Sequence, residues 1–423
     1  MGKYDELLRN AKIPVMYRLH QTFDAGHIHD VQSRAAETII ATGCLSAVKG
    51  RKVAIAVGSR GIANLCELVG VTVDLLKQWG AEIFIVPAMG SQGGAVAENQ
   101  KEMIAHLGIT EEKMGVPIRA TMETSVLGYT PQGEPVHFDK FAAEADYTVS
   151  IVRVKPHTSF RGKYESGIVK MNVMGLGNQR GADACHHLGM HVMGESLERF
   201  GAVSLEKSNL LFSLAVVENA YDKICIIRAI PKTQVLHQEP ALLKAAFEKL
   251  PKLPIEDLDV LLVDEMGKNI SGTGVDSNIV QSFTSPHMPA RLIAKCIVVL
   301  DLTDETAGVG SGMGLINIAS QRFFNKIDFF KTYPNAITSR TPMAARMPII
   351  MPNDCDAIRA GIIAAWGVDY DNPRMIRIKN TMRLDSMLIS ETLLPSARLL
   401  HGVHIDETPI RLRFDPNGNL MAE

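Results

Sequence analysis

Apolar runs of strand length alternate with amphipathic segments along the first half of the chain. Residues 53–57 (VAIAV) are continuously apolar, and apolar residues then recur with helical spacing from Ile62 to Leu76. The same order returns at residues 81–108, where an apolar strand, a glycine turn and a helix ending at Gly108 follow one another. Strands that are apolar on both faces belong to parallel sheets covered by helices on each side. The pattern therefore predicts an α/β fold.

Each predicted strand ends in a turn that carries glycines and polar side chains. The three turns are residues 58–61 (GSRG), 90–94 (GSQGG) and 155–162 (KPHTSFRG). Ligands of parallel sheets bind at the carboxyl ends of the strands, so we expect Arg60, Gln92 and His157 to line one crevice. A histidine in this position is suited to act as a base near neutral pH, the alternative being a loop histidine that only satisfies its neighbours.

The GSRG turn has the features of an anion site. Free amides at the start of the following helix, the Ser59 hydroxyl and the Arg60 guanidinium are expected to meet beside Gly61. The anion could be a phosphate or a carboxylate, and the turn alone does not distinguish them. The alternative is a simple glycine-rich connection with Arg60 in solvent.

The second half of the chain repeats the alternation after a stretch rich in proline between about residues 225 and 255. We expect residues 1–245 to form an N-terminal α/β domain and residues 246–423 a second α/β domain that closes over the substrate. Both sheets should be mainly parallel, with a cleft between the domains. Lys268 and Asn269, in a glycine-rich loop after a predicted strand, are expected to reach a substrate carboxylate or hydroxyl, unless they satisfy the loop's own backbone.

Composition narrows the class of protein. The chain has 423 residues, 46 % hydrophobic content and a formal net charge of −2, which give no electrostatic footprint for nucleic acid or an anionic membrane. No apolar run approaches the ~20 residues of a membrane span. The six cysteines are widely spaced and form no C-x-x-C motif, which favours a reducing cytoplasm. The expected partner is a small molecule, and a homo-oligomer is left open.

Residues 155–191 gather one lysine after a Ser-Gly turn, several histidines and many glycines. Lys170 lies in an apolar, glycine-rich stretch, where a lysine requires a partner or a covalent role. His186 and His187 follow, and imidazole is a common metal ligand. The segment therefore has the residues needed to tether a planar cofactor and ligate its metal. The alternative is a surface lysine followed by two histidines with structural partners.

The tethering segment resembles that of a known family. ESGIVKMNVMGLG (165–177) is similar to the lysine motif of the nickel-dependent lactate racemase superfamily, whose members use a nickel-pincer nucleotide attached to a lysine. The turns GSRG and AMGSQGG are also similar to turns of this family. The resemblance implies that Lys170 carries the cofactor and that His186, or else His187, ligates nickel. It also implies that cofactor-binding residues are Ser59, Arg60, Gly61, Ser166 and Gly167.

The activity implied by the resemblance is the racemisation or epimerisation of a 2-hydroxy acid by hydride transfer to and from the cofactor. His157 is then expected to act as the base, Gln92 to orient the hydroxyl, and Arg60 to hold the substrate carboxylate or the cofactor. Gln92 stands where the family has a catalytic histidine, and an amide cannot act as a base. Two rival functions are a nicotinamide-dependent oxidoreductase that uses residues 308–314 (GVGSGMG) and a non-catalytic protein that binds hydroxy acids or nucleotides.

Overall fold

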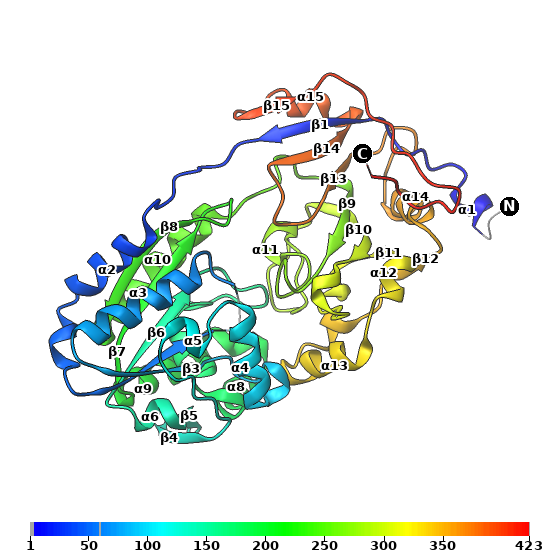
Figure 1. The fold of residues 1–423 in the computed structure, drawn as a ribbon. Coiled ribbons are helices and arrows are strands. Elements are labelled where there is room, and N and C mark those ends of the chain that lie inside the picture. Colours follow the sequence, from blue (N-terminus) through cyan, green and yellow to red (C-terminus); the bar gives the residue numbers. More distant parts are fainter. Residues whose placement is uncertain (1–3, 59–60, 423) are drawn as a thin grey trace. The chain divides into compact units, whose positions relative to one another are not determined.

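The chain folds into two α/β units. A computed structural model describes residues 4–58 and 61–422. Its contacts divide the chain into one unit of Asp24–Leu250 and a second unit that consists of Pro251–Glu423 and the N-terminal segment up to Phe23. The boundary lies at residue 250 rather than the expected 245. The N-terminal segment, which we expected in the first domain, belongs to the second unit. Its strand β1 (Met16–Gln21) pairs with two strands of that unit, as the blue strand among orange and red ones in Figure 1 shows.

The unit of residues 24–250 is built on a five-stranded sheet of order β3-β2-β6-β7-β8. Its strands are β2 (Lys52–Val57), β3 (Glu82–Pro87), β6 (Tyr147–Arg153), β7 (Leu210–Glu218) and β8 (Ile224–Pro231). The first four strands in this order are parallel and β8 is antiparallel to β7. The predicted α/β fold with a mainly parallel sheet is confirmed for this unit.

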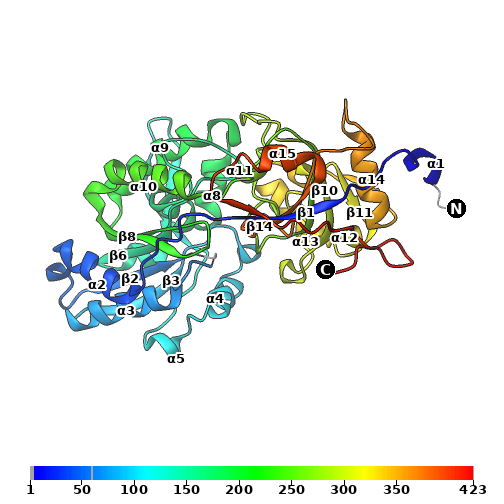
Figure 2. The same cartoon turned by 90° about the horizontal axis from the view of Figure 1, so that it is seen from above.

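Helices cover both faces of this sheet. α2 (Val31–Ala41) and α3 (Leu65–Gln78) lie on one side, and α9 (Met193–Lys207) and α10 (Val235–Lys249) lie on the other (Figure 2). This arrangement explains why residues 53–57 are apolar without alternation, since every one of them is fully buried.

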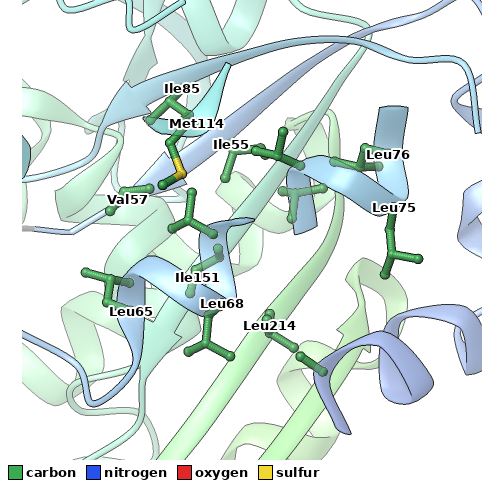
Figure 3. Close-up of a cluster of buried hydrophobic side chains, with 14 of the residues drawn as sticks. Ile55, Val57, Leu65, Leu68, Leu75, Leu76, Ile85, Met114, Ile151 and Leu214 are labelled. Carbon is green, nitrogen blue, oxygen red and sulfur yellow. The ribbon is translucent and has the colours of Figure 1, made fainter. Parts of the chain in front are cut away.

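One core lies between the sheet and helices α2 and α3. Ile55 of β2, Ile151 of β6 and Leu214 of β7 gather there with Leu68 of α3 (Figure 3). Each such side chain contributes about 1.5–3 kcal/mol when fully buried. These contacts fix the strands, and therefore the turns at their carboxyl ends.

Shorter elements follow the strands of this unit. They are α4 (Ala97–His106), α5 (Glu111–Met114), the hairpin of β4 (Thr124–Tyr129) and β5 (Pro135–Asp139), α6 (Lys140–Glu144), α7 (Ile168–Lys170) and α8 (Asn178–His186). A π-helical turn, Met171–Gly175, continues α7 directly. Such turns are rare and frequently lie at functional sites.

The second unit contains an eight-stranded sheet of order β12-β11-β10-β9-β13-β14-β1-β15. Pairing is parallel from β12 to β13 and antiparallel from β13 to β15. Besides β1, its strands are β9 (Leu258–Met266), β10 (Ala294–Leu302), β11 (Ile318–Ser320), β12 (Ile349–Met351), β13 (Met375–Ile378), β14 (Ser386–Ser390) and β15 (Val403–Ile405). Its helices are α1 (Asp5–Leu8), α11 (Ser277–Val280), α12 (Gln321–Asn325), α13 (Phe329–Thr338), α14 (Asp354–Ala364) and α15 (Leu394–Ala397). In the described part of the chain no helix has the length and apolarity required to cross a bilayer.

Candidate functional site

The carboxyl ends of β2 and β3 meet the helical turn that carries Lys170. The Ala88 N–H after β3 donates to the carbonyl of Val57 at the end of β2 over 2.8 Å. The Gly90 N–H then donates to the carbonyl of Gly175, the last residue of the π-helical turn, over 3.1 Å. The glycine turn after β3 and the lysine segment, which are about eighty residues apart in the sequence, therefore share one site.

The turn after β2 reaches the same place. A Cβ built on Gly58 would lie 3.1 Å from the Cε atom of Met171, the residue that follows Lys170. Ser59 and Arg60, which were predicted to bind the cofactor and substrate, lie outside the described residues. Gly61 is exposed, and a Cβ built there would meet no described atom within 4 Å, so its backbone is accessible.

A buried carboxyl holds the start of the helix that carries Lys170. Glu239 of α10 is 1 % exposed, and its Oε2 atom accepts the Val169 N–H over 2.9 Å. A Cβ on Gly167 would lie 2.1 Å from Glu239 Oε1, so only glycine leaves room for the carboxyl. Burial raises the pKa of Glu239 to about 7, although the amides of Val169 and Ile168 favour its anion. Glu239 Oε1 has no hydrogen-bond partner among the described residues.

Lys170 is half-buried and lies within electrostatic range of an acid and a thiol. Burial raises the pKa of Glu165, and the Lys170 ammonium is one of the groups that oppose this rise. Burial also raises the pKa of the Cys185 thiol to about 12, again against the influence of Lys170. Cys185 therefore stays a neutral thiol, and the lysine end of the site is enclosed rather than fully solvated.

The two candidate metal ligands lie at the end of α8, beside Cys185. His186 is the last residue of the helix and is half-buried, whereas His187 is exposed. In residues 4–58 and 61–422, no group of three histidine, cysteine, aspartate or glutamate residues could hold a metal ion.

His157 is fixed by contacts to its backbone and its ring. Its N–H donates to Glu165 Oε2 over 2.6 Å, and its carbonyl accepts from Arg161 Nη1 over 2.7 Å. The Ser159 N–H donates to His157 Nδ1 over 3.1 Å, and the ring lies against Phe160 with a centroid distance of 4.2 Å. Glu165 and Arg161 were not among the residues predicted from the sequence. They lie four residues apart in a predicted loop, and this spacing did not indicate that they bond the backbone of His157.

Gln92 lies in a turn whose backbone is fixed by a second glutamine. Gln92 is half-buried and precedes the short helical turn at Gly93. The Nε2 atom of Gln100, on α4, donates to the carbonyls of Gly90 and Gln92 over 3.0 and 2.9 Å. Gln100 is 1 % exposed and was not predicted. Its amide, rather than the glycines alone, sets the course of the turn.

One backbone amide near the predicted anion site after β2 is already bonded to a carboxylate of the protein. The Ala63 N–H donates to Glu218 Oε1 over 2.7 Å, and Arg153 Nη1 donates to the other oxygen over 2.5 Å. Helix α3 begins at Leu65, so the GSRG turn does not open the helix directly as expected. One amide donor near the helix start is thus already paired with a carboxylate.

Ser166 and the second-unit candidates lie in well-bonded backbone. The carbonyl of Ser166 accepts the Lys155 N–H over 3.0 Å, which closes the loop that contains His157. In the second unit, Asn269 Oδ1 accepts the Thr303 hydroxyl over 2.7 Å. The N–H of Lys268 donates to the Thr306 hydroxyl oxygen over 3.0 Å. Both partners lie after β10, so these bonds tie the loop of Lys268 and Asn269 to the neighbouring loop.

The glycines of residues 308–314 serve close packing. A Cβ on Gly312 would lie 1.9 Å from the carbonyl oxygen of Thr273, and one on Gly314 would lie 1.7 Å from that of Met343. The segment leads into strand β11 and not into a helix. A dinucleotide fingerprint requires a strand, a glycine turn and a helix in direct succession, so the oxidoreductase alternative has no structural support here.

One solved structure has a similar fold. No protein-family model matches the chain, and neither does a curated protein. A crystal structure of a Thermotoga maritima protein from a structural genomics programme is similar, with a TM-score of 0.51 and 13 % identity over 84 % of this chain and 97 % of that one. The apoprotein of lactate racemase from Thermoanaerobacterium thermosaccharolyticum has a TM-score of 0.47 and 16 % identity, over 83 % of this chain and 85 % of that one. The first likeness concerns the fold alone, and neither establishes an activity.

Proposed function

We propose that the protein is an isomerase that racemises or epimerises a 2-hydroxy acid with a nickel-pincer nucleotide covalently bound to Lys170. The setting of Lys170 is the observation that carries this function. The lysine is half-buried at the carboxyl ends of parallel strands, on a helical turn held by the buried carboxyl of Glu239. The resemblance of residues 165–177 to the family's tethering motif supplies the identity of the cofactor.

The described residues fit such a group. Lys170 offers an amine for the covalent bond, and His186 offers a half-buried imidazole for the metal, with the exposed His187 as the alternative. Gly61 and Gly94 have open space where a Cβ would lie, so the backbone there can approach a phosphate or carboxylate closely. When bound, the cofactor would supply the hydride acceptor and donor that no protein side chain provides.

The chain's own residues would bind and orient the substrate. We assign the contact with the substrate hydroxyl to His157 and Gln92, and the carboxylate to Arg60. Rigid placement of His157 by Glu165 and Arg161 would reduce the entropy lost on reaching the reactive geometry.

The experiment is an isotope-tracing assay with protein produced together with enzymes that make the cofactor. A panel of short 2-hydroxy acids, deuterated at the α carbon, would be tested for interconversion of configuration. We expect conversion with deuterium largely retained, and loss of conversion in Lys170→Ala but not in the exposed neighbour Lys163→Ala. Conversion that persists in Lys170→Ala, or deuterium lost to water, would overturn the proposal.

A second candidate function is ligand binding without turnover. Gln92, which replaces the histidine of the family, favours it. This function predicts that a 2-hydroxy acid binds in calorimetry while no panel member changes configuration.

A further inference from the structure

Helix α10 contains a proline at a position where a regular helix uses an amide donor. In an α-helix each carbonyl accepts the N–H of the residue four positions later, and proline has no N–H. Pro240 lies inside α10, so the carbonyl of Leu236 lacks its regular helical donor. The proline ring also pushes against the carbonyl four residues before it. The Leu236 carbonyl is therefore available to a donor from outside the helix.

The hydroxyl group of Tyr164 binds this carbonyl. Tyr164 Oη donates to the Leu236 carbonyl oxygen over 2.8 Å, and Tyr164 is 2 % exposed. The bond gives a partner to the buried phenol and replaces the helical donor that Pro240 cannot supply. Tyr164 directly precedes residues 165–177, the segment that contains Lys170. The proline thus creates a contact between α10 and the start of that segment.

A second contact lies on the same face of α10, three residues after Leu236. Glu239 Oε2 accepts the Val169 N–H over 2.9 Å. Residues three apart are neighbours on the surface of a helix, so α10 holds the chain on both sides of the Ser-Gly turn at residues 166–167. The approach is close, because a Cβ on Gly167 would lie 2.1 Å from Glu239 Oε1.

An apolar core surrounds these two polar contacts. Side chains of the lysine segment and of α10 belong to one buried cluster, which includes Tyr164, Ile168, Val169, Val235, Leu242 and Leu243. Hydrogen bonds in such surroundings are stronger than bonds exposed to water. Lys170 directly follows Val169, so the place of its backbone depends on both contacts.

We propose that α10 positions Lys170, and that Pro240 contributes by freeing the Leu236 carbonyl for Tyr164. The inference rests on the proposed function, because it names the residues that place its tethering lysine. Tyr164 and Glu239 act through the backbone of residues 164–170, which makes them positioning residues. A displacement of about 1 Å at a reacting group can cost about 10²-fold in rate, so a tethering lysine requires firm support.

The direct test is hydrogen exchange in the cofactor-free protein, measured by mass spectrometry at single residues. Tyr164→Phe removes only the hydroxyl group. The amide of Val169, and that of Lys155, which donates to the Ser166 carbonyl, should then exchange about three- to tenfold faster, as expected for the loss of one hydrogen bond. The amides of β2 should exchange as in the wild type. Unchanged rates at Val169 and Lys155 would overturn the proposal.

Pro240→Ala separates the role of the proline from the stability of the helix. The new N–H is the regular donor to the Leu236 carbonyl and competes with Tyr164. The variant should unfold at the same or a higher urea concentration, because proline is the least favourable residue inside a helix, while the Val169 amide exchanges at least about twofold faster. Pro334→Ala, inside α13 of the second unit, is the matched control and should leave exchange at Val169 unchanged. Wild-type exchange at Val169 in Pro240→Ala, or faster exchange together with easier unfolding, would overturn the proposal.

The kinetic arm uses cofactor-loaded enzyme and short 2-hydroxy acids. Per modified chain, Tyr164→Phe should lower kcat about three- to tenfold and leave KM within about twofold, because the hydroxyl does not bind substrate. Glu239→Gln keeps an oxygen for the Val169 N–H and should retain more of kcat than Glu239→Leu. A changed KM with wild-type kcat, or equal losses in the two Glu239 variants, would overturn the positioning role. If the wild type converts no 2-hydroxy acid, the proposed function fails, and hydrogen exchange still decides whether α10 holds residues 164–170.

Discussion

Replacement of Gly167 by alanine should weaken the support of Lys170. The backbone φ of Gly167 is 172°, which any residue adopts, so only space decides the effect. The new Cβ would lie 2.1 Å from Glu239 Oε1 and 3.0 Å from Glu239 Cδ. The carboxyl must withdraw, and its bond with the Val169 N–H is then lost. Overpacking costs about 1–3 kcal/mol and a lost hydrogen bond about 1 kcal/mol, which gives a destabilisation of about 2–4 kcal/mol.

Urea unfolding followed by circular dichroism measures this difference directly. Gly70→Ala is the matched control, because Gly70 lies inside α3 and a Cβ there would meet no described atom within 4 Å. That control should be about 0.5–1 kcal/mol more stable than the wild type, as alanine is the better helix former. If Gly167→Ala unfolds at the same urea concentration as the wild type, the close approach of Glu239 to Gly167 does not exist in solution.

A double-mutant cycle checks that Glu239 is the partner. Glu239→Ala removes the group with which the new methyl would collide. Gly167→Ala should therefore cost at least about 1 kcal/mol less in the Glu239→Ala background than in the wild type. Additive losses would mean that the clash is with another group.

Variants of Glu239, Arg161 and Gln100 test neighbouring contacts. The pKa of Glu239 is raised from 4.5 to about 7 in the folded protein. Between these two pH values the carboxyl is therefore mostly neutral in the folded state and mostly ionised in the unfolded state. The free energy of unfolding of the wild type, relative to that of Glu239→Gln, should be highest below pH 4.5 and fall by about 3 kcal/mol as the pH rises to 7. A difference that does not change with pH in urea unfolding would contradict this. Arg161→Ala removes the cation that is paired with the buried Glu165 and leaves only the charge of Lys170 near it, and it should lower the free energy of unfolding by about 1–3 kcal/mol, with a smaller loss in Arg161→Lys. Gln100→Ala removes two hydrogen bonds from the turn at Gln92 and should cost about 1–3 kcal/mol and speed hydrogen exchange of the turn's amides, and unchanged exchange would count against its role.

Local pattern was sufficient to predict the strands that carry the site. Residues 53–57 are apolar at every position because helices cover both faces of the sheet, and this made β2 recognisable. The rule that parallel strands present their carboxyl ends at one edge led us to expect Arg60, Gln92 and His157 in one crevice, and this stays a prediction. The hydrogen bond between Gly90 and Gly175 joins the turn of Gln92 to the helical turn after Lys170, a contact that the pattern did not predict.

Contacts between distant segments could not be predicted in the same way. Glu239 lies 70 residues beyond Val169 and sits in a stretch whose prolines suggested a domain boundary, yet it forms part of α10, with Pro240 inside the helix. Strand β1 joins a sheet made mostly of residues beyond 250, where it pairs with β14 and β15. The sequence around β1 does not show which distant strands it pairs with. Neither the close approach of Glu239 to Gly167 nor the pairing of β1 with the second unit has a local sequence signal.

The most direct test of the account is the mass of Lys170 itself. Protein made alongside the cofactor's biosynthetic enzymes would be examined by intact-mass spectrometry, peptide mapping and metal analysis, with Lys170→Ala as the control. The account predicts an added mass that maps to Lys170, about one nickel per modified chain, and neither in the control. An unmodified Lys170 without nickel under these conditions would contradict it.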